Sequence, residues 1–378
     1  MISWPKEKLD KICRPKQWPT IPTSVMVKDG YPVYGANGKI GFYTEYTHER
    51  PTLLITCRGA TCGTLNISEP FSYVTGNAMA LDELDEDRVD QKFLFYALNQ
   101  RGLNDVITGS AQPQITRQSL SSVEIPLPPL EEQRRIAAIL DKADAIRRKR
   151  QESIRLTEEF LRSTFLEMFG DPVTNPKGWG IEKLGNVISS IDSGWSANGT
   201  DRSKKPDEWA VLKISAVTSG RFISSEYKAL DEEIPSGRKI IVPKRGDLLF
   251  SRANTRELVA ATCLVENDQD KLFIPDKLWR VIPKQDLCTS EYLRYLLAHN
   301  KFREQITKKA TGTSGSMLNV SMEKVREEPA PIPPISLQNK FAQILWKCFD
   351  SRNRIEHSNM NSIDLFNSLT HRAFRGEL

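Results

Sequence analysis

The chain has 378 residues, and its 53 lysines and arginines against 48 aspartates and glutamates give a formal net charge of +5. With 39% hydrophobic and 27% charged residues it has the composition of a globular protein, which excludes disordered, collagen-like and disulfide-scaffold proteins. Its length predicts two or three domains. The mild positive charge permits nucleic-acid binding without requiring it.

The N-terminal segment and the cysteines predict a cytoplasmic protein. No stretch reaches the roughly 18 to 20 apolar residues that span a bilayer, and residues 1–16 carry charges where a signal peptide would be apolar. The six cysteines are sparse and irregularly spaced, which indicates free thiols in a reducing compartment. They are Cys13, Cys57, Cys62, Cys263, Cys288 and Cys348.

The sequence of residues 1–127 predicts a block of mixed α+β structure. The run from Thr52 to Thr56 has the composition of a strand, and Gln91 to Asn99 has the apolar spacing of a helix. The glycine-rich segment 35–41 contains the turn dipeptide Asn37-Gly38, and its glycines are wrongly spaced for a phosphate loop. We therefore expect a β-hairpin there.

A long helix is predicted from residue 131 to residue 169. Pro128-Pro129 ends extended structure, Glu131-Glu132 places negative charge in the first helical turn, and Gly170-Asp171-Pro172 ends the helix. Apolar residues recur three and four positions apart along its length. At about 1.5 Å per residue, the helix is about 58 Å long.

The same plan is repeated in the second part of the chain. Residues 171–332 predict another α+β block, and a helix from Ser336 to Phe374 follows it. In this block we expect strands in Ala210 to Ile214 and Asp247 to Phe250, and a helix in Glu291 to His299. The predicted domains are thus two blocks, 1–127 and 171–332, and two helical regions, 128–170 and 333–378.

An internal repeat supports this organisation. Residues 126–169 align without a gap with residues 331–374, at an offset of 205, and share twelve identities in 44 positions. Average residue usage would give roughly three. Upstream, Leu53 to Thr56 corresponds to Leu248 to Ser251, and Gly109 to Gln112 corresponds to Gly312 to Gly315.

Two helices of equal length from one chain predict an antiparallel coiled coil with a pseudo-twofold axis. A helix this long cannot bury its apolar stripe alone, and the stripe spacing is close to that of a coiled-coil seam. The residues expected to pack between helices or subunits are Ile136, Ile139, Leu140, Ile146, Phe160, Phe341, Ile344, Leu345 and Phe374.

The sequence evidence for catalytic residues is weak. Asp207, Glu226 and Lys228 resemble the acidic and lysine residues of metal-dependent nucleases, but such short patterns arise by chance in charged chains. Cys57 and Cys62 could form half of a zinc site, yet no second pair has a suitable spacing. We interpret the acidic residues as part of a solvated loop and the two cysteines as buried structural thiols, and we predict no metal site.

Polar and basic residues on loops form the remaining pattern. Arginine follows the corresponding apolar runs of both blocks, and arginine pairs with guanine edges and phosphate as asparagine and glutamine pair with adenine. A surface arginine is nevertheless more often simply solvated. The candidate DNA-binding residues are Arg58, Gln112, Gln114, Arg117, Arg252, Asn254, Arg256 and Asn319.

Two motifs indicate a family. The segment Pro126 to Leu140, leading into a helix that ends in Phe165 to Pro172, resembles the first conserved region of the specificity (S) subunits of type I restriction–modification systems. The segment Arg372 to Leu378 is similar to the second conserved region. The resemblance covers the whole chain.

This resemblance implies a non-catalytic subunit that binds double-stranded DNA. Each block, a target-recognition domain, would read one half of a bipartite asymmetric site, while the helices set the spacer. Two methyltransferase (modification) subunits, which use S-adenosylmethionine, would dock on the chain, and motor-nuclease (restriction) subunits, which use ATP and Mg²⁺, would join them. The chain itself would bind no cofactor and no membrane. The sequence leaves open a metal nuclease acting alone and an oligomerisation scaffold that does not bind DNA.

Overall fold

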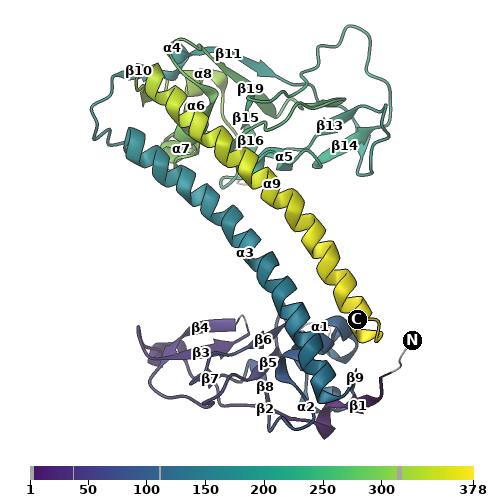
Figure 1. Ribbon diagram of the computed structural model, residues 1–378. Coiled ribbons are helices and arrows are strands. Elements are labelled where there is room, and N and C mark those ends of the chain that lie inside the picture. The colour runs from purple at the N-terminus through teal and green to yellow at the C-terminus, as the bar shows by residue number, and fades with distance from the viewer. Residues whose placement is uncertain (1–3, 37, 110–111, 313–316) are drawn as a thin grey trace. The chain divides into compact units, whose positions relative to one another are not determined.

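The structure is a computed structural model that describes residues 4–36, 38–109, 112–312 and 317–378, with only the backbone for residues 359–361. The chain forms two compact units (Figure 1). Unit 1 contains residues 1–151 and 356–378, and unit 2 contains residues 152–355. The two units are defined by spatial contacts, whereas the predicted domains were defined by the sequence repeat. The predicted division into two blocks and two helical regions therefore stays a prediction.

Two helices of 40 residues contribute to both units, α3 (Leu130–Phe169) and α9 (Ile335–Phe374). Both predicted helices are confirmed, each beginning one residue earlier than expected. Gly170 ends α3 with a φ of +81°, in the left-handed region that favours glycine. A Cβ at this position would lie 2.9 Å from Cγ of Pro176, so the turn also requires the absence of a side chain.

Unit 1 has a four-stranded antiparallel sheet in the order β2-β8-β5-β6. Its central strand β5 confirms the strand predicted at Thr52 to Thr56, and Ile55 on β5 faces Met79 on β8. All four residues of β5 are buried. Leu53 and Ile55 pack in a cluster with apolar side chains of α1 and the start of α3, whereas Leu54 packs in a second cluster with Tyr34 and Val74. The strands are β2 (Arg14–Gln17), β5 (Leu53–Thr56), β6 (Leu65–Ile67) and β8 (Ala78–Asp82).

A smaller sheet in unit 1 has the order β4-β3-β7, with β7 parallel to β3. The predicted hairpin is confirmed, since Gly35 at the end of β3 pairs with Gly38 at the start of β4. Asn37, between them, lies outside the described residues. The strands are β3 (Tyr31–Gly35), β4 (Gly38–Tyr43) and β7 (Tyr73–Val74).

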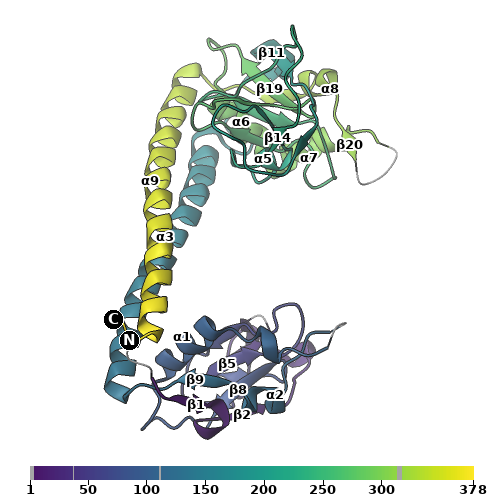
Figure 2. The same ribbon diagram turned by 90° about the vertical axis from the view of Figure 1, so that its right-hand side faces the viewer.

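Helix α1 (Gln91–Arg101) confirms the helix predicted at Gln91 to Asn99 and lies beside the start of α3 (Figure 2). The Tyr96 hydroxyl donates to the Asp141 carboxylate of α3 at 2.7 Å, which joins the two helices. The chain enters and leaves this block through one antiparallel pair, β1 (Lys6–Lys8) with β9 (Glu124–Pro126). The short α2 (Arg117–Ser121) precedes β9.

Unit 2 repeats this plan. Its main sheet has the order β11-β19-β15-β17, in which all neighbours are antiparallel, and its second sheet has the order β12-β14-β13-β18, with β18 parallel to β13. The predicted strands at Ala210 to Ile214 and Asp247 to Phe250 are confirmed. The strands are β11 (Ile188–Ser193), β12 (Gly199–Thr200), β13 (Ala210–Leu212), β14 (Tyr227–Leu230), β15 (Leu248–Ser251), β17 (Thr262–Leu264), β18 (Leu272–Phe273) and β19 (Leu278–Pro283).

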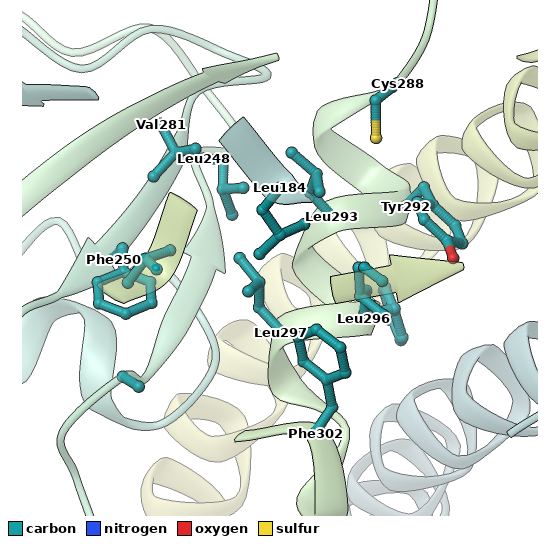
Figure 3. Close-up of a cluster of buried hydrophobic side chains, with 14 of the residues drawn as sticks. Leu184, Leu248, Phe250, Val281, Cys288, Tyr292, Leu293, Leu296, Leu297 and Phe302 are labelled. Atoms are coloured by element: carbon teal, nitrogen blue, oxygen red, sulfur yellow. The ribbon is translucent and has the colours of Figure 1, made fainter. Parts of the chain in front are cut away.

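Helix α6 (Ser290–Ala298) packs on the main sheet of unit 2 and confirms the helix predicted at Glu291 to His299. Its residues Leu293 and Leu297 lie toward β15 in the buried cluster (Figure 3).

The other helices and strands of unit 2 are short. They are β10 (Ile181–Lys183) paired with β21 (Pro329–Pro331), β16 (Ala253–Asn254) paired with β20 (Leu318–Asn319), α4 (Leu184–Val187), α5 (Ser215–Thr218), α7 (Asn300–Lys308) and α8 (Met322–Arg326).

The long helices pack against each other inside each unit, running in opposite directions. In unit 2 the Phe341 ring of α9 lies 5.7 Å from the Phe165 ring and 5.5 Å from the Phe169 ring of α3, measured between centroids. In unit 1 Leu140 of α3 and Ala373 of α9 share one buried cluster.

The residues predicted to pack fall into three groups. Buried residues are Ile136, Leu140, Phe341 and Leu345, and half-buried residues are Ile139, Ile344 and Phe374. Ile146 and Phe160 are instead 49% and 53% exposed, since the apolar stripe turns out of the helix contact at these two positions. Across the described residues, no helix is both long and apolar enough to cross a bilayer.

Candidate nucleic-acid interface

In both units, the main chain just beyond the central strand of the main sheet pairs with the segment that precedes the long helix. In unit 1 the Ile115 amide donates to the Cys57 carbonyl at 3.0 Å, and in unit 2 the Val320 amide donates to the Arg252 carbonyl at 2.9 Å. These equivalent bonds place one loop of each block beside the end of β5 or β15. The loops hold most of the candidate DNA-binding residues.

A second pair of equivalent bonds fixes the loop residues. Thr108 and Gln114 exchange two backbone hydrogen bonds of 2.8 Å, and Thr311 and Asn319 exchange two of the same length. Gln114 and Asn319, which the sequence proposed as base-reading residues, therefore occupy the same position in the two blocks. Gln114 is exposed, whereas Asn319 is half-buried.

The arginines at this strand end are one residue out of register. Arg58 forms a backbone bridge with Gln114, while Ala253 pairs with Asn319, so the counterpart of Arg58 is Ala253. Arg252 corresponds to the buried Cys57. The sequence placed arginine at the same strand end in both blocks, and the structure adds that the two arginines hold different positions there. Successive side chains in extended structure point to opposite faces, so the two are not interchangeable.

The contacts of the two arginines also differ. Arg58 is exposed. Arg252 is half-buried: its Nε donates to the Asp276 carbonyl at 2.8 Å, and its Nη2 lies 3.3 Å from the Asp276 carboxylate. Arg252 therefore holds a loop of its own block, and Arg58 is the one whose guanidinium faces solvent.

The other candidates lie on the same loops or close to them. The Asn254 side chain accepts a hydrogen bond from the Thr255 amide at 2.8 Å, which stabilises its own turn, and Arg256 two residues later is exposed. Gln112 is exposed beside Gln114. Arg117, exposed at the start of α2, lines a cavity of 710 Å³ in unit 1.

The residues proposed for a nuclease do not form a metal site. The Asp207 carboxylate is exposed and paired with Lys271 at 2.9 Å, and that hydrogen bond lowers its pKa. The Glu226 carboxylate accepts from the Ser215 hydroxyl at 2.6 Å. Within the described ranges, no group of three or more His, Cys, Asp or Glu residues is placed to hold a metal ion.

The cysteines are all free thiols. Cys57 is fully buried and accepts a hydrogen bond from Gln17 Nε2 at 3.0 Å, and its burial raises its pKa. Cys62 is half-buried. This placement agrees with a buried structural thiol at Cys57, whereas Cys62 is less buried than predicted.

Comparison with known proteins gives consistent matches. The family model of the type I restriction modification DNA specificity domain matches residues 1–157 and 176–365. The chain is 28% identical over 242 residues to the EcoEI specificity subunit of Escherichia coli, a match that covers 61% of this chain and 40% of that subunit. It is 25% identical over 305 residues to the EcoKI specificity subunit of Escherichia coli strain K12, which covers 75% of this chain and 63% of that subunit. The matches thus span about two fifths and three fifths of these relatives.

A solved structure has a similar fold. The crystal structure of the type I restriction-modification system S subunit from M. genitalium superimposes with a TM-score of 0.67 at 16% identity, covering 99% of this chain and 96% of that one. At this level of identity the likeness concerns the fold alone.

Proposed function

The chain belongs to the family of type I restriction modification DNA specificity domains, as its sequence motifs predicted, and from this premise we propose that it is the non-catalytic specificity subunit of a type I restriction–modification complex. Each block, 1–127 and 171–332, is a target-recognition domain that reads one half of a bipartite asymmetric site in double-stranded DNA. The observation that carries the proposal is the duplicated loop beside β5 and β15, with Gln114 and Asn319 at equivalent positions.

The residues on these loops have the chemistry of base and phosphate recognition. Arginine, glutamine and asparagine side chains pair with base edges, and arginine also pairs with phosphate. Arg58, Gln112, Gln114 and Arg117 serve the first recognition domain. Arg252, Asn254, Arg256 and Asn319 serve the second. The different residues at equivalent positions support two different half-sites.

The helical regions 128–170 and 333–378 form the spacer in this proposal. The antiparallel packing of α3 and α9 inside each unit supports an antiparallel coiled coil with a pseudo-twofold axis, whose length sets the distance between half-sites. The exposed apolar side chains of Ile146 and Phe160 on α3 are available to subunits that dock there. Two modification subunits supply S-adenosylmethionine-dependent methylation. Restriction subunits supply ATP- and Mg²⁺-dependent cleavage, and this chain itself binds no cofactor.

The experiment is co-expression of this chain with the modification subunits of its host, followed by single-molecule sequencing to map methylated bases. We expect one split motif with a fixed gap. Methylation without sequence preference would contradict the proposal, and unmodified DNA despite a stable complex would favour the DNA-independent scaffold. Cleavage by this chain alone that is lost in Asp207→Ala would favour the nuclease.

A matched control separates recognition from assembly. The double variant Arg58→Ala with Gln114→Ala changes exposed side chains of the first block only. It should weaken or relax recognition of one half-site while the complex still forms and the other half-site is still required. Loss of both half-sites would show that the variant acts through assembly.

A further inference from the structure

Unit 2 contains a cavity of about 320 Å³ that the proposed function does not use. It lies where the last turns of α3 meet α6, the start of α7 and two loops of the second block. Its polar lining comes from Arg162, Arg294, Tyr295, His299 and Arg303, and Phe165 contributes to an apolar wall.

Among the described ion pairs, none involves Arg294 or Arg303, and Glu158, the carboxylate that acts on Tyr295, is paired with Arg352. Arg294 is only 5% exposed, and its Nη2 donates to the neutral Gly220 carbonyl at 2.7 Å. Arg303 donates to the neutral carbonyls of Val259, at 2.8 Å, and Glu257, at 2.7 Å. Burial lowers the pKa of Arg303. A buried cation without a counter-ion is costly, so the cavity favours an anion.

Two buried polar atoms that line the same cavity lack a partner. Tyr295 is 4% exposed, and no described residue lies within hydrogen-bonding reach of its hydroxyl. The same holds for Nδ1 of His299, as far as the structure describes the chain. A buried donor left without an acceptor costs free energy, and such groups normally have a partner. A bound oxyanion would accept from the Tyr295 hydroxyl, and from His299 Nδ1 in the tautomer that carries the proton there.

The first block provides an internal comparison. The N-cap residues Asp90 of α1 and Thr289 of α6 are 199 residues apart, and this offset relates Tyr295 to Tyr96. The Tyr96 hydroxyl donates to Asp141 at 2.7 Å. Arg294, at the same offset, corresponds to the uncharged Phe95 of the first block. The Tyr295 hydroxyl, which has no partner among the described residues, and the Arg294 charge therefore distinguish the second block from the first and do not follow from the shared fold.

The start of α7 adds to the field in the cavity. Asn300, the first residue of this nine-residue helix, lines the cavity, and its N-cap residue His299 makes no side-chain capping bond. The positive end of the helix dipole favours an anion there. Asp171 is the acidic residue whose charge acts on His299. Its carboxylate already has other partners, because it accepts hydrogen bonds from the Val173 and Thr174 amides and lies 3.6 Å from Lys301.

We infer that this cavity binds a small phosphomonoester, with its phosphate among Arg162, Arg294, Arg303 and the Tyr295 hydroxyl, and its organic part against Phe165. Guanidinium groups bind phosphate bidentately through two parallel hydrogen bonds. The volume lies at the lower end of the range for small-molecule sites, which excludes large cofactors. The inference does not depend on the proposed reading of DNA.

The test is calorimetric titration of the full chain with phenyl phosphate and, separately, with inorganic phosphate, at constant ionic strength. We expect one saturable site for each, tighter for phenyl phosphate. Arg162→Gln and Tyr295→Phe should each weaken binding about tenfold, because each removes one hydrogen-bond donor to an anion. Arg162 is exposed, and the Tyr295 hydroxyl lacks a partner among the described residues, so neither change should unfold unit 2.

Two matched controls make the outcome specific. Arg155→Gln removes the same charge from α3 outside the cavity, and Tyr96→Phe removes the equivalent hydroxyl from the first block. Both should leave phosphate binding unchanged. No saturable binding, or equal weakening by Arg155→Gln, would overturn the inference. Release of bound phenyl phosphate by duplex DNA without terminal phosphates would assign the cavity to the DNA backbone, and would overturn it too.

Discussion

Gln133 and Gln338, 205 residues apart, are both fully buried and make the same three hydrogen bonds. The Gln133 amide donates to the carbonyls of Pro128 and Arg88, each at 2.8 Å, and accepts from the Asp90 amide at 2.9 Å. The Gln338 amide donates to Pro333 at 2.8 Å and Leu287 at 3.1 Å, and accepts from the Thr289 amide at 3.0 Å. Each glutamine thus ties the first turn of a long helix to the N-cap of α1 or α6, which fixes the block to its helix.

Replacing either glutamine should destabilise its own unit. Gln133→Leu or Gln338→Leu removes all three hydrogen bonds of a fully buried side chain, and we expect a loss of about 2–4 kcal/mol in the free energy of unfolding. Denaturant unfolding measures the loss, and hydrogen exchange should locate it at the start of α1 or of α6 respectively. The exposed Gln118→Leu is the control. A change below about 0.5 kcal/mol, as is usual for a surface substitution, would contradict this role.

A buried ion cluster fixes the second block to the helices. Arg352 is fully buried, lies 2.7 Å from Glu158 of α3, and pairs with Glu266 after β17. Arg352→Met leaves two carboxylates without their counter-ion and should cost about 3–5 kcal/mol. The triple variant that also carries Glu158→Leu and Glu266→Leu should recover most of the loss, because all three charges are then absent. Urea unfolding of the two variants checks this, and equal instability of both would argue against the ion cluster.

The out-of-register arginines should behave differently when substituted. Arg58→Ala removes an exposed side chain and should leave the melting temperature unchanged while it lowers DNA affinity and the salt dependence of binding. Arg252→Ala also removes two contacts to Asp276, so it should lower both stability and affinity. Thermal unfolding and fluorescence anisotropy with the mapped site distinguish the two. A stability loss in Arg58→Ala would contradict the solvent-facing placement.

The proposed spacer role predicts a length dependence. Insertion of one helical turn, about four residues, after Gln151 in α3 and after Ile355 in α9 should lengthen the spacer by about 5.4 Å, between one and two base pairs of about 3.4 Å. Methylation mapping of the variant complex reads the new gap. An unchanged gap in an active complex would refute the ruler, and replacement of four residues without insertion is the length-matched control.

Thiol reactivity should follow burial. Burial raises the pKa of Cys13 and of Cys288 to about 12, so few thiolates exist at these positions at pH 8. Cys62 and Cys348 are only half-buried. In the native protein iodoacetamide should therefore modify Cys62 and Cys348 first and the four buried thiols only on unfolding, as peptide mass spectrometry can measure. Early modification of Cys288 would indicate local opening around α6.

Local patterns predicted the long helices well but the loops less well. Periodicity and the proline, glutamate and glycine signals around residues 128–172 act within a few residues, and both helix ends were predicted to within one residue. The same periodicity placed Ile146 and Phe160 in the packed stripe, although both are exposed, because helix contact depends on the partner and not on spacing alone. The register of Arg58 relative to Arg252 depends on backbone hydrogen bonds between segments that are distant in the sequence, and no local pattern predicts such bonds.

The sequence alone determined the family, the duplicated plan and the ends of the helices, since these rest on repeated residues and on short-range backbone preferences. The tertiary structure decided which repeated residues have equivalent contacts. Gln133 and Gln338 do, whereas Tyr96 has an acidic partner and Tyr295 faces a cationic cavity. That cavity needs Arg162 of α3 together with residues more than 130 positions later, from Arg294 onward. Its charge and burial exist only once packing brings these distant side chains together, because desolvation depends on all the neighbours of a group and not on its place in the chain.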